Sequence, residues 1–261
     1  MTKPTVYLVG SGPGSVDLLT VAAYRIITAA DVLIVDALVG DEIIALASNA
    51  EIICVGKRAG RLSPTQSTIN SLLIEQASAA KVSGKTVVRL KGGDPLIFAR
   101  AQEEIDALND ASITFAIIPG ISAIQAAHAH IKQPMTRRGV QRALVIATPQ
   151  VQAGDTMGIA WARPLVAAGG GAIYMAASAA SRIKGTLLAL GLAASTPVTW
   201  VANAGRSDCT VYSQQLDTLS APLLAKNAAV ILLVGIESQS WNSSAICGAS
   251  QALALPAPSL V

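Results

Sequence analysis

The amino-acid sequence predicts an α/β protein built from two α/β domains, with a parallel sheet in the N-terminal domain and a mixed sheet in the C-terminal domain. Three observations lead to this prediction. Apolar residues make up 52% of the chain but aromatic residues only 3%, as in cores built from Ala, Val, Ile and Leu. Apolar strands alternate with helices through the first half of the chain. Beyond residue 120, strands follow one another with fewer helices between them.

The first half alternates regularly between strands and helices. Short apolar runs predict strands at residues 5–10, 31–36, 51–56, 86–91 and 114–120. Helices are predicted at residues 15–30, 41–48, 63–83 and 102–110. Ser15 is the expected N-cap of the first helix, while Ser63, Pro64 and Gln66 form the expected start of the long helix that ends before Gly84. This alternation predicts βαβ units and a parallel sheet with right-handed crossovers.

The second half is richer in strands. It begins with a helix of small residues at 121–130, followed by strands predicted at 143–147, 171–175, 197–203, 210–213 and 228–235. Helices are predicted at 181–191 and, more briefly, at 221–225. We therefore expect an N-terminal domain at 1–119 and a C-terminal domain at 120–237. Residues 238–261 are rich in Ser, Ala and Pro and are predicted to be a poorly ordered tail.

Charge and apolar runs argue against several classes of protein. A formal net charge of +3 does not favour nucleic-acid binding. The uncharged run Leu165–Ala180 is shorter than the roughly 20 residues of a membrane span. The N-terminal apolar run is too short for a signal-peptide core, so we expect a cytoplasmic protein. The only histidines, His128 and His130, should point to different sides of a helix, and we predict no metal site.

Glycine-rich segments follow three of the predicted strands. They read "GSGPGS" at 10–15, "VGKRAG" at 55–60 and "KGGDP" at 91–95. Ligands of parallel sheets bind beyond the carboxyl ends of the strands, and glycine lets the backbone approach a ligand closely. Asp94 could instead cap a helix opened by Pro95. Both interpretations of this loop stay open at the level of residue patterns.

The first glycine segment resembles a dinucleotide-binding fingerprint. Asp36 stands where such a fingerprint places its ribose-binding acid. However, Ser15 replaces the third glycine, and Pro13 removes an N–H group from the turn. A Rossmann-type oxidoreductase therefore remains only an alternative.

Two basic clusters also lie beside glycines. Residues 57–61 contain two arginines and a lysine, and residues 137–142 contain three arginines. Each cluster is either a solvated loop or part of a site for an acidic small molecule.

Five of these segments together resemble one known family. They are "VGSGPGSVDLLT", "ADVLIVDALV", "VGKRAG", "RLKGGDPLIFAR" and "IIPGISA". In this order they are similar to the uroporphyrinogen-III C-methyltransferases of the tetrapyrrole methylase family, over roughly residues 4–236. The resemblance implies the tetrapyrrole methylase fold, two α/β domains with a cleft between them, and a homodimer. It further implies methyl transfer from S-adenosylmethionine to C-2 and C-7 of uroporphyrinogen III, giving precorrin-2 for sirohaem, cobalamin or haem d1.

The resemblance also assigns site residues. Asp36 matches the family's proposed proton acceptor and Lys57 its proposed proton donor. Ser122 stands where the family usually has threonine and keeps the hydroxyl group. The side chains implied for binding the tetrapyrrole carboxylates are Arg58, Arg137 and Arg138. The residues implied for the S-adenosylmethionine pocket are Pro13, Gly92, Gly93, Asp94, Ile97, Ser122, Ala123, Met175 and Ala204.

The chain departs from the family pattern mainly on the side expected to hold the tetrapyrrole. It has "VDALV" where the family usually has "YDRLV", and "FARAQEE" in place of "FGRGGEE". The segment "IATPQ" replaces the usual "VTGH". Two alternatives follow: a methyltransferase of the same fold that acts on another precorrin, and a member without turnover, for which Ala37 in place of arginine is the motive.

Overall fold

A computed structural model describes residues 3–56, 64–139, 142–149, 158–223 and 228–236. The chain divides into two compact units, Met1–His130 and Ile131–Val261. The domain boundary expected near residue 120 precedes this division by one helix. The tail expected at 238–261 lies outside the described residues.

The sheet of unit 1 is entirely parallel, as predicted. Its strands, in spatial order, are β3 (Glu51–Cys54), β2 (Val32–Val35), β4 (Val87–Lys91), β1 (Val6–Gly10) and β5 (Phe115–Ile118). The central strands β1, β2 and β4 are almost wholly buried, which explains their unbroken apolar runs. Strand β4 lies between β1 and β2, whereas dinucleotide-binding sheets place β1 directly beside β2.

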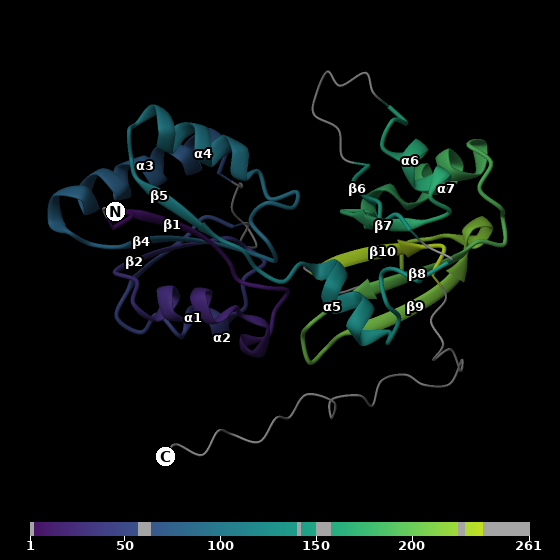
Figure 1. Cartoon of the computed structure of the whole chain (residues 1–261), viewed down its shortest axis with the longest axis horizontal. Coiled ribbons are helices and arrows are strands. Elements are labelled where there is room, and N and C mark those ends of the chain that lie inside the picture. The colour runs from purple at the N-terminus through teal and green to yellow at the C-terminus, as the bar shows by residue number, and fades with distance from the viewer. Residues whose placement is uncertain (1–2, 57–63, 140–141, 150–157, 224–227, 237–261) are drawn as a thin grey trace, which may run out of the picture. The chain divides into compact units, whose positions relative to one another are not determined.

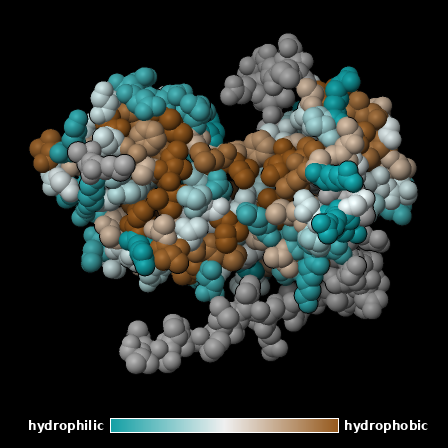
Figure 2. Space-filling model, in the orientation of Figure 1, coloured by the Kyte–Doolittle hydropathy of each residue, from teal (hydrophilic) through white to brown (hydrophobic). Residues whose placement is uncertain are grey.

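Helices cover both faces of this sheet (Figure 1). On one face, α1 (Val21–Thr28) and α2 (Asp41–Ile44) bury Ile27 and Ile43 against β2 and β4. On the other, α3 (Gln66–Ser83) and α4 (Ala101–Asp110) bury Leu73 and Leu108. The outer sides of α3 and α4 are largely hydrophilic (Figure 2). Neighbouring strands β1 and β4 thus lead into helices on opposite faces, and ligands bind parallel sheets at such switch points.

The first helix predicted in unit 1 is interrupted. Residues 15–30 form a 3-10 turn, η1 (Val16–Leu18), and then α1, instead of one helix. Ser15 does cap η1, but the Thr20 hydroxyl caps α1 by accepting a hydrogen bond from the Ala23 N–H at 3.1 Å. A second threonine cap inside the predicted helix therefore starts a new one.

The long helix α3 begins later than predicted. Its N-cap is Thr65, whose hydroxyl accepts from the Thr68 N–H at 3.2 Å, so the capping box proposed for Ser63 and Gln66 is wrong. Its predicted end is confirmed. Gly84 adopts a left-handed φ of 73° directly after the last turn, a conformation that glycine adopts without strain.

The sheet of unit 2 is mixed, again as predicted. Its strands, in spatial order, are β6 (Ile146–Ala147), β7 (Gly171–Tyr174), β10 (Val230–Val234), β8 (Pro197–Ala202) and β9 (Thr210–Gln215). Among the strands that the structure describes in this unit, only β6 and β7 pair in parallel. The expected helix at 221–225 is wrong for residues 221–223, which form no helix, and the Leu223 side chain is fully exposed.

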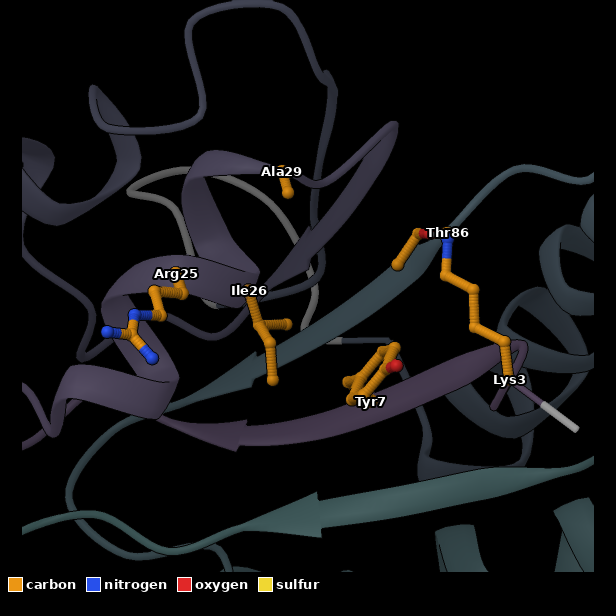
Figure 3. A pocket seen from close by; sticks show the side chains of 6 residues that line it. All are labelled: Lys3, Tyr7, Arg25, Ile26, Ala29 and Thr86. Atoms are coloured by element: carbon orange, nitrogen blue, oxygen red, sulfur yellow. Dashed lines mark hydrogen bonds between the residues drawn. The ribbon is translucent and has the colours of Figure 1, made fainter. Parts of the chain in front are cut away.

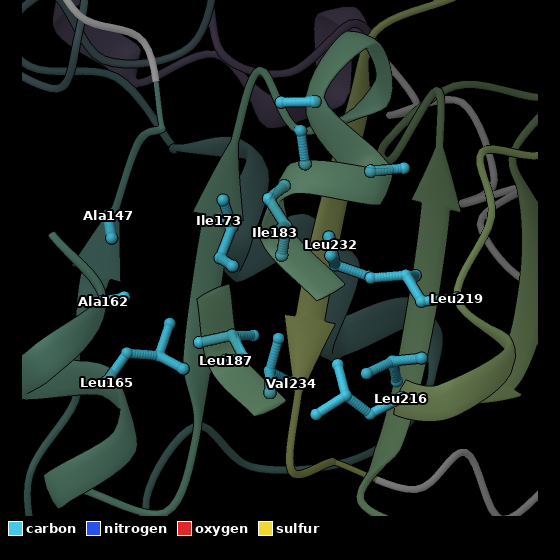
Figure 4. Close-up of a cluster of buried hydrophobic side chains, with 14 of the residues drawn as sticks. Ala147, Ala162, Leu165, Ile173, Ile183, Leu187, Leu216, Leu219, Leu232 and Val234 are labelled. Atoms are coloured by element: carbon cyan, nitrogen blue, oxygen red, sulfur yellow. The ribbon is translucent and has the colours of Figure 1, made fainter. Parts of the chain in front are cut away.

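Apolar side chains fill the core of unit 2 (Figure 4). Helix α7 (Ala180–Ala189) contributes Ile183 and Leu187, which cluster with Ile173, Leu232 and other strand residues. Helix α6 (Ala162–Ala167) joins the same core and was not predicted, because it carries no charged face beyond its first turn. The buried Trp200 indole N–H donates to the Ser220 carbonyl at 3.0 Å. In the described part of the chain, no helix is both long and apolar enough to cross a membrane.

Candidate functional site

Four glycines bring the loops after β1, β4 and β5 into direct backbone contact. Gly12 and Gly93 exchange hydrogen bonds, with N–H to O distances of 3.1 and 2.8 Å. A Cβ added to Gly10 would lie 2.6 Å from the Gly93 oxygen and 2.7 Å from the Gly120 nitrogen. A Cβ on Gly120 would overlap the Gly93 oxygen. Only glycine therefore allows these loops to meet at the carboxyl edge of the sheet.

Beside Gly93 the structure leaves open space. Its φ is 68°, and a Cβ added there would meet no atom within 4 Å. The neighbouring Gly92 is different, because a Cβ there would approach the Leu38 side chain to 2.9 Å. The loop after β4 thus exposes its backbone at one position and packs closely at the next, as expected of a loop that cradles a ligand.

Asp94 joins two of the loops. Its side chain is buried; Oδ1 accepts from the Leu96 N–H at 2.8 Å and Oδ2 from the Gly120 N–H at 2.9 Å. Residues 95–99 form a turn and bends, and α4 begins only at Ala101, so the alternative in which Asp94 caps a helix opened by Pro95 is wrong. The carboxylate caps a turn and fixes the loop after β5 to the loop after β4.

The segment between Asp94 and α4 contains backbone strain. Phe98 and Arg100 have φ values of 50° and 56°, which non-glycine residues rarely adopt. The Arg100 guanidinium forms two 2.7 Å bonds with the Glu103 carboxylate in the first turn of α4. Ile97, assigned to the cofactor pocket, donates its N–H to the Asp94 carbonyl at 3.3 Å. Strained segments of this kind concentrate at ligand sites.

The other residues assigned to the pocket in unit 1 lie at the same edge. Pro13 follows Gly12 in the loop after β1. Ser122 precedes helix α5 (Ala123–His130), and its buried N–H donates to Gln125 Oε1 at 2.6 Å. Because β4, β1 and β5 are neighbours in the sheet, their three loops and the first residue of α5 carry seven of the nine assigned cofactor residues to one edge.

Asp36 lies at the carboxyl end of β2 and belongs to a buried ionic cluster. Its Oδ1 is 2.5 Å from Arg89 Nη2, and its Oδ2 is 3.9 Å from Lys91 Nζ. Arg89 Nε also contacts Glu104 Oε1 at 2.9 Å, while Lys91 Nζ lies 2.9 Å from both Glu104 oxygens. Two cations thus share two carboxylates. Burial and the nearby Arg89 charge lower the pKa of Lys91, which Glu104 and Asp36 partly counteract.

The sequence reasoning missed three members of this cluster. Arg89 and Lys91 occupy alternate positions of the apolar strand β4 and so point to one face. Glu104, on α4, is fully buried on that face. The signal was present, since two cations in an otherwise apolar parallel strand require buried partners.

Unit 2 contributes the remaining two assigned cofactor residues. Met175 follows β7 and Ala204 follows β8. Both strands run antiparallel to β10, with Tyr174 in register with Ile231 and Ala202 with Val230. Met175 and Ala204 therefore emerge at the same edge of the second sheet. Met175 is 44% exposed with a φ of 54°, an unusual combination for a methionine.

Asn203, directly before Ala204, is also in the left-handed region, with a φ of 52°. Its Nδ2 donates to Asp208 Oδ2 at 2.7 Å, and its Oδ1 accepts from the Ala229 N–H at 3.1 Å. These bonds hold the loop after β8 against the start of β10, and Asn tolerates the conformation better than most residues.

For the basic residues assigned to substrate binding, the structure gives little information on their surroundings. Lys57 and Arg58 lie outside the described residues. Arg137 and Arg138 are exposed and belong to unit 2. On α5, His128 is buried and His130 is exposed. Among the described residues, no group of three His, Cys, Asp or Glu side chains could hold a metal ion.

A small hollow of about 130 Å³ lies at the opposite edge of the first sheet (Figure 3). It is bounded by Arg25 and Ile26 of α1, by Tyr7, and by Lys3, whose Nζ donates to Thr86 Oγ1 at 2.9 Å. Thr86 directly precedes β4, so this hollow is near the amino ends of the strands. It is separate from the glycine loops at their carboxyl ends.

The chain is similar to known proteins over most of its length. A family model described as Tetrapyrrole (Corrin/Porphyrin) Methylases matches residues 5–220. A protein named siroheme synthase 1 from Serratia proteamaculans is 42% identical over 230 residues, 86% of this chain and 47% of that protein. The siroheme synthase of Zymomonas mobilis is 38% identical, covering 92% of this chain and 51% of that protein. The chain spans about half the length of the curated relatives it matches.

Two solved structures share its fold. Uroporphyrin III C-methyltransferase from Thermus thermophilus, in its native form, matches with a TM-score of 0.73 and 28% identity, over 88% of this chain and 96% of that chain. The Thermus thermophilus protein complexed with S-adenyl homocysteine matches with a TM-score of 0.73 and 29% identity, over 87% and 96%. The predicted fold class is thereby confirmed.

Proposed function

Because the chain belongs to the tetrapyrrole (corrin/porphyrin) methylase family, we propose that it transfers methyl groups from S-adenosylmethionine to uroporphyrinogen III. The methylated positions are C-2 and C-7, and the product is precorrin-2. One observation carries the proposal: seven residues that match the family's cofactor motifs gather on three touching loops at the carboxyl edge of the first sheet. A similar protein from Thermus thermophilus has been solved with S-adenyl homocysteine, the demethylated form of that cofactor.

The residues present fit S-adenosylmethionine. The open space beside Gly93 accepts part of a ligand without displacing protein atoms. Asp94 keeps the Gly93 and Gly120 loops together, so its role is to shape the pocket, since both of its carboxylate oxygens already accept backbone hydrogen bonds. Met175 and Ala204 of unit 2 are also proposed as cofactor-binding residues, because they match the family's motifs. The bound cofactor supplies an activated methyl group, and the protein has to orient the reactants and exclude water.

Asp36 is proposed as the proton acceptor. The ring carbons C-2 and C-7 already carry side chains, so adding a methyl group leaves a quaternary carbon and a positively charged ring, which becomes neutral by losing a proton from an adjacent position. The Asp36 side chain is 29% exposed, whereas its partners Arg89 and Lys91 are buried. A substrate can therefore reach the Asp36 carboxylate but neither of the two cations. Lys57 is proposed as the proton donor, and Arg58, Arg137 and Arg138 are proposed to bind carboxylates of the substrate.

Two alternatives are less well supported. The strand order of unit 1 and the membership in the family argue against a Rossmann-type oxidoreductase. A member of this family that acts on another precorrin, motivated by "FARAQEE" and "IATPQ", is distinguished by the substrate it methylates. A homodimer and a cytoplasmic location stay predictions, and light scattering of the purified chain tests the first.

The test is anaerobic incubation of the purified chain with enzymatically generated uroporphyrinogen III and S-adenosylmethionine, followed by mass spectrometry of the tetrapyrrole. We expect two added methyl groups. An unmodified tetrapyrrole, in the presence of demonstrated S-adenosylmethionine binding, would contradict the proposed substrate and leave the cofactor assignment intact. In that case the same assay with other precorrins tests the alternative.

A further inference from the structure

We infer that Arg89 is a positioning residue for Asp36, and that Glu104 and Lys91 hold Arg89 in place for this purpose. The inference rests on the proposed function, because it concerns the proton acceptor of that reaction. It starts from the ionic cluster that connects α4, β4 and β2 beneath the carboxyl edge of the first sheet.

The geometry of Arg89 is that of a bridge between two carboxylates. Nη2 contacts Asp36 Oδ1, and Nε contacts Glu104 Oε1, so the two ends of one guanidinium are fixed by different elements. Nη1 lies 3.5 Å from the Ile34 carbonyl and 3.4 Å from that of Leu90. A planar guanidinium can maintain such a set of directed bonds, whereas the Lys91 ammonium approaches Glu104 to 2.9 Å but Asp36 only to 3.9 Å.

The cluster is polarised from the interior toward solvent. Glu104, Arg89 and Lys91 are 0 to 2% exposed, and Asp36 is 29% exposed. Two cations balance two carboxylates, so ionised Asp36 completes the charge balance of the buried groups. Buried ion pairs contribute little net stability compared with apolar residues of similar volume. Stability alone therefore does not explain why four charged side chains are clustered here. Of the four, only Asp36 is accessible to a substrate.

Fixing Asp36 has a direct consequence for the proposed proton transfer. The methyl–sulfur bond of the cofactor breaks as the new bond to the ring carbon forms, and a C–H bond of a methylene bridge beside the methylated ring then breaks. Its electron pair neutralises the cationic ring, and the proton moves to the Asp36 carboxylate. This step needs the carboxylate ionised and one oxygen directed at the substrate. Arg89 occupies Oδ1, and Lys91 lies farther from Oδ2 at 3.9 Å. Oδ2 is therefore the oxygen with the weaker protein contact, and we assign it as the proton-accepting atom.

A double-mutant cycle on the methylation rate tests this inference. Single-turnover rates are measured for the wild-type chain, Asp36→Asn, Arg89→Gln and the double variant. We expect Asp36→Asn to be slower by about 10²- to 10⁴-fold, as for loss of a general base. Arg89→Gln should lose about 100-fold, as for a misplaced catalytic group. If Arg89 acts through Asp36, the double variant is no slower than Asp36→Asn to within about twofold.

Matched variants separate positioning from folding. Arg89→Lys keeps the cation and should recover part of the rate, while its melting temperature and S-adenosylmethionine affinity stay close to wild type. Arg25→Gln removes the same charge from an exposed position on α1 and should leave the rate unchanged. Multiplied losses in the double variant, or equal losses in Arg89→Lys and Arg89→Gln, would overturn the inference. An inactive wild-type chain would instead overturn the proposed function and, with it, this role for Arg89.

Discussion

The two units differ in where they place polar groups. In the described part of the chain, every buried charged side chain lies in unit 1, namely Arg89, Lys91, Asp94 and Glu104. Among the described residues of unit 2, the one buried polar side chain is the uncharged Thr199, whose hydroxyl donates to the Ile236 carbonyl at 3.1 Å. The core of unit 2 is otherwise apolar. The described part of unit 1 thus contains a buried polar network, and that of unit 2 contains a hydrophobic core beside a sheet edge with strained loops.

The direction of the strands explains this difference between the two units. The parallel sheet of unit 1 sends the carboxyl ends of all its strands to one edge, so glycine loops and the Asp36 cluster meet there. The antiparallel pairing of unit 2 sends only some strand ends to each edge. The edge of unit 2 at which β7 and β8 end carries Met175 and Asn203, whose backbones adopt left-handed conformations.

The largest expected effect comes from breaking the ionic cluster of unit 1. Glu104→Gln leaves two buried cations with one carboxylate and should lower the free energy of unfolding by about 3–5 kcal/mol. Glu103→Gln, one position earlier on α4, removes an exposed partner of Arg100 and should cost about 0.5 kcal/mol or less. Urea denaturation of both variants measures the contrast, and equal costs would show that burial does not set the importance of the cluster.

The second-largest loss of stability is expected from disturbing the backbone contact between the glycine loops. Gly120→Ala forces a Cβ into the Gly93 oxygen and should destabilise the protein by about 3 kcal/mol, with loss of S-adenosylmethionine binding. Gly185→Ala is the control in unit 2, because that glycine is exposed within α7 and a Cβ there would meet no atom within 4 Å. It should gain about 0.5–1 kcal/mol. Thermal unfolding and calorimetric titration give both quantities, and a tolerated Gly120→Ala would contradict the close contact.

Asp94 tests whether loop geometry governs cofactor affinity. Asp94→Ala removes the acceptor of the Leu96 and Gly120 N–H groups and should weaken S-adenosylmethionine binding by about 1–3 kcal/mol. Asp94→Asn keeps one acceptor oxygen and should fall between Ala and wild type. Unchanged affinity of the alanine variant in isothermal titration calorimetry would remove Asp94 from the site.

The smallest effect concerns the strained edge of unit 2. Met175→Gly relieves a left-handed backbone and should leave stability unchanged or raise it by up to about 1 kcal/mol. Binding of S-adenosylmethionine should weaken by about 1 kcal/mol, since an apolar contact is lost. Met135→Gly, which does not relieve a positive φ, should instead lower stability by about 0.5–1 kcal/mol. A stability loss at Met175 as large as that at Met135 would argue that its conformation is not strained.

Much of unit 1 could be predicted because its signals are local. Unbroken apolar runs identified the strands, and glycines after them identified the loops that meet at Gly93. The two interpretations of the loop at Pro95 stayed open because Asp94 bonds across to Gly120, far away in sequence, instead of capping a helix. The ionic partners of Asp36 were missed for the same reason, since they depend on strand neighbours and on α4.

Unit 2 was harder to predict. Helix α6 carries no polar stripe that would distinguish it from a strand, so periodicity could not identify it. The opposite error at 221–223 came from a largely apolar segment that forms no regular secondary structure and is mostly exposed. The left-handed backbone at Met175 has no sequence signal, because the residue that normally marks this conformation is glycine.

The most direct test of the proposed reaction is to locate the transferred carbon. The purified chain is incubated anaerobically with uroporphyrinogen III and S-adenosylmethionine labelled with ¹³C in the methyl group, and the tetrapyrrole is examined by ¹³C nuclear magnetic resonance. Labelled methyl groups on C-2 and C-7, formed over many turnovers, are the predicted result. A tetrapyrrole without label would contradict the proposed reaction, and label at other ring carbons would contradict the assigned positions.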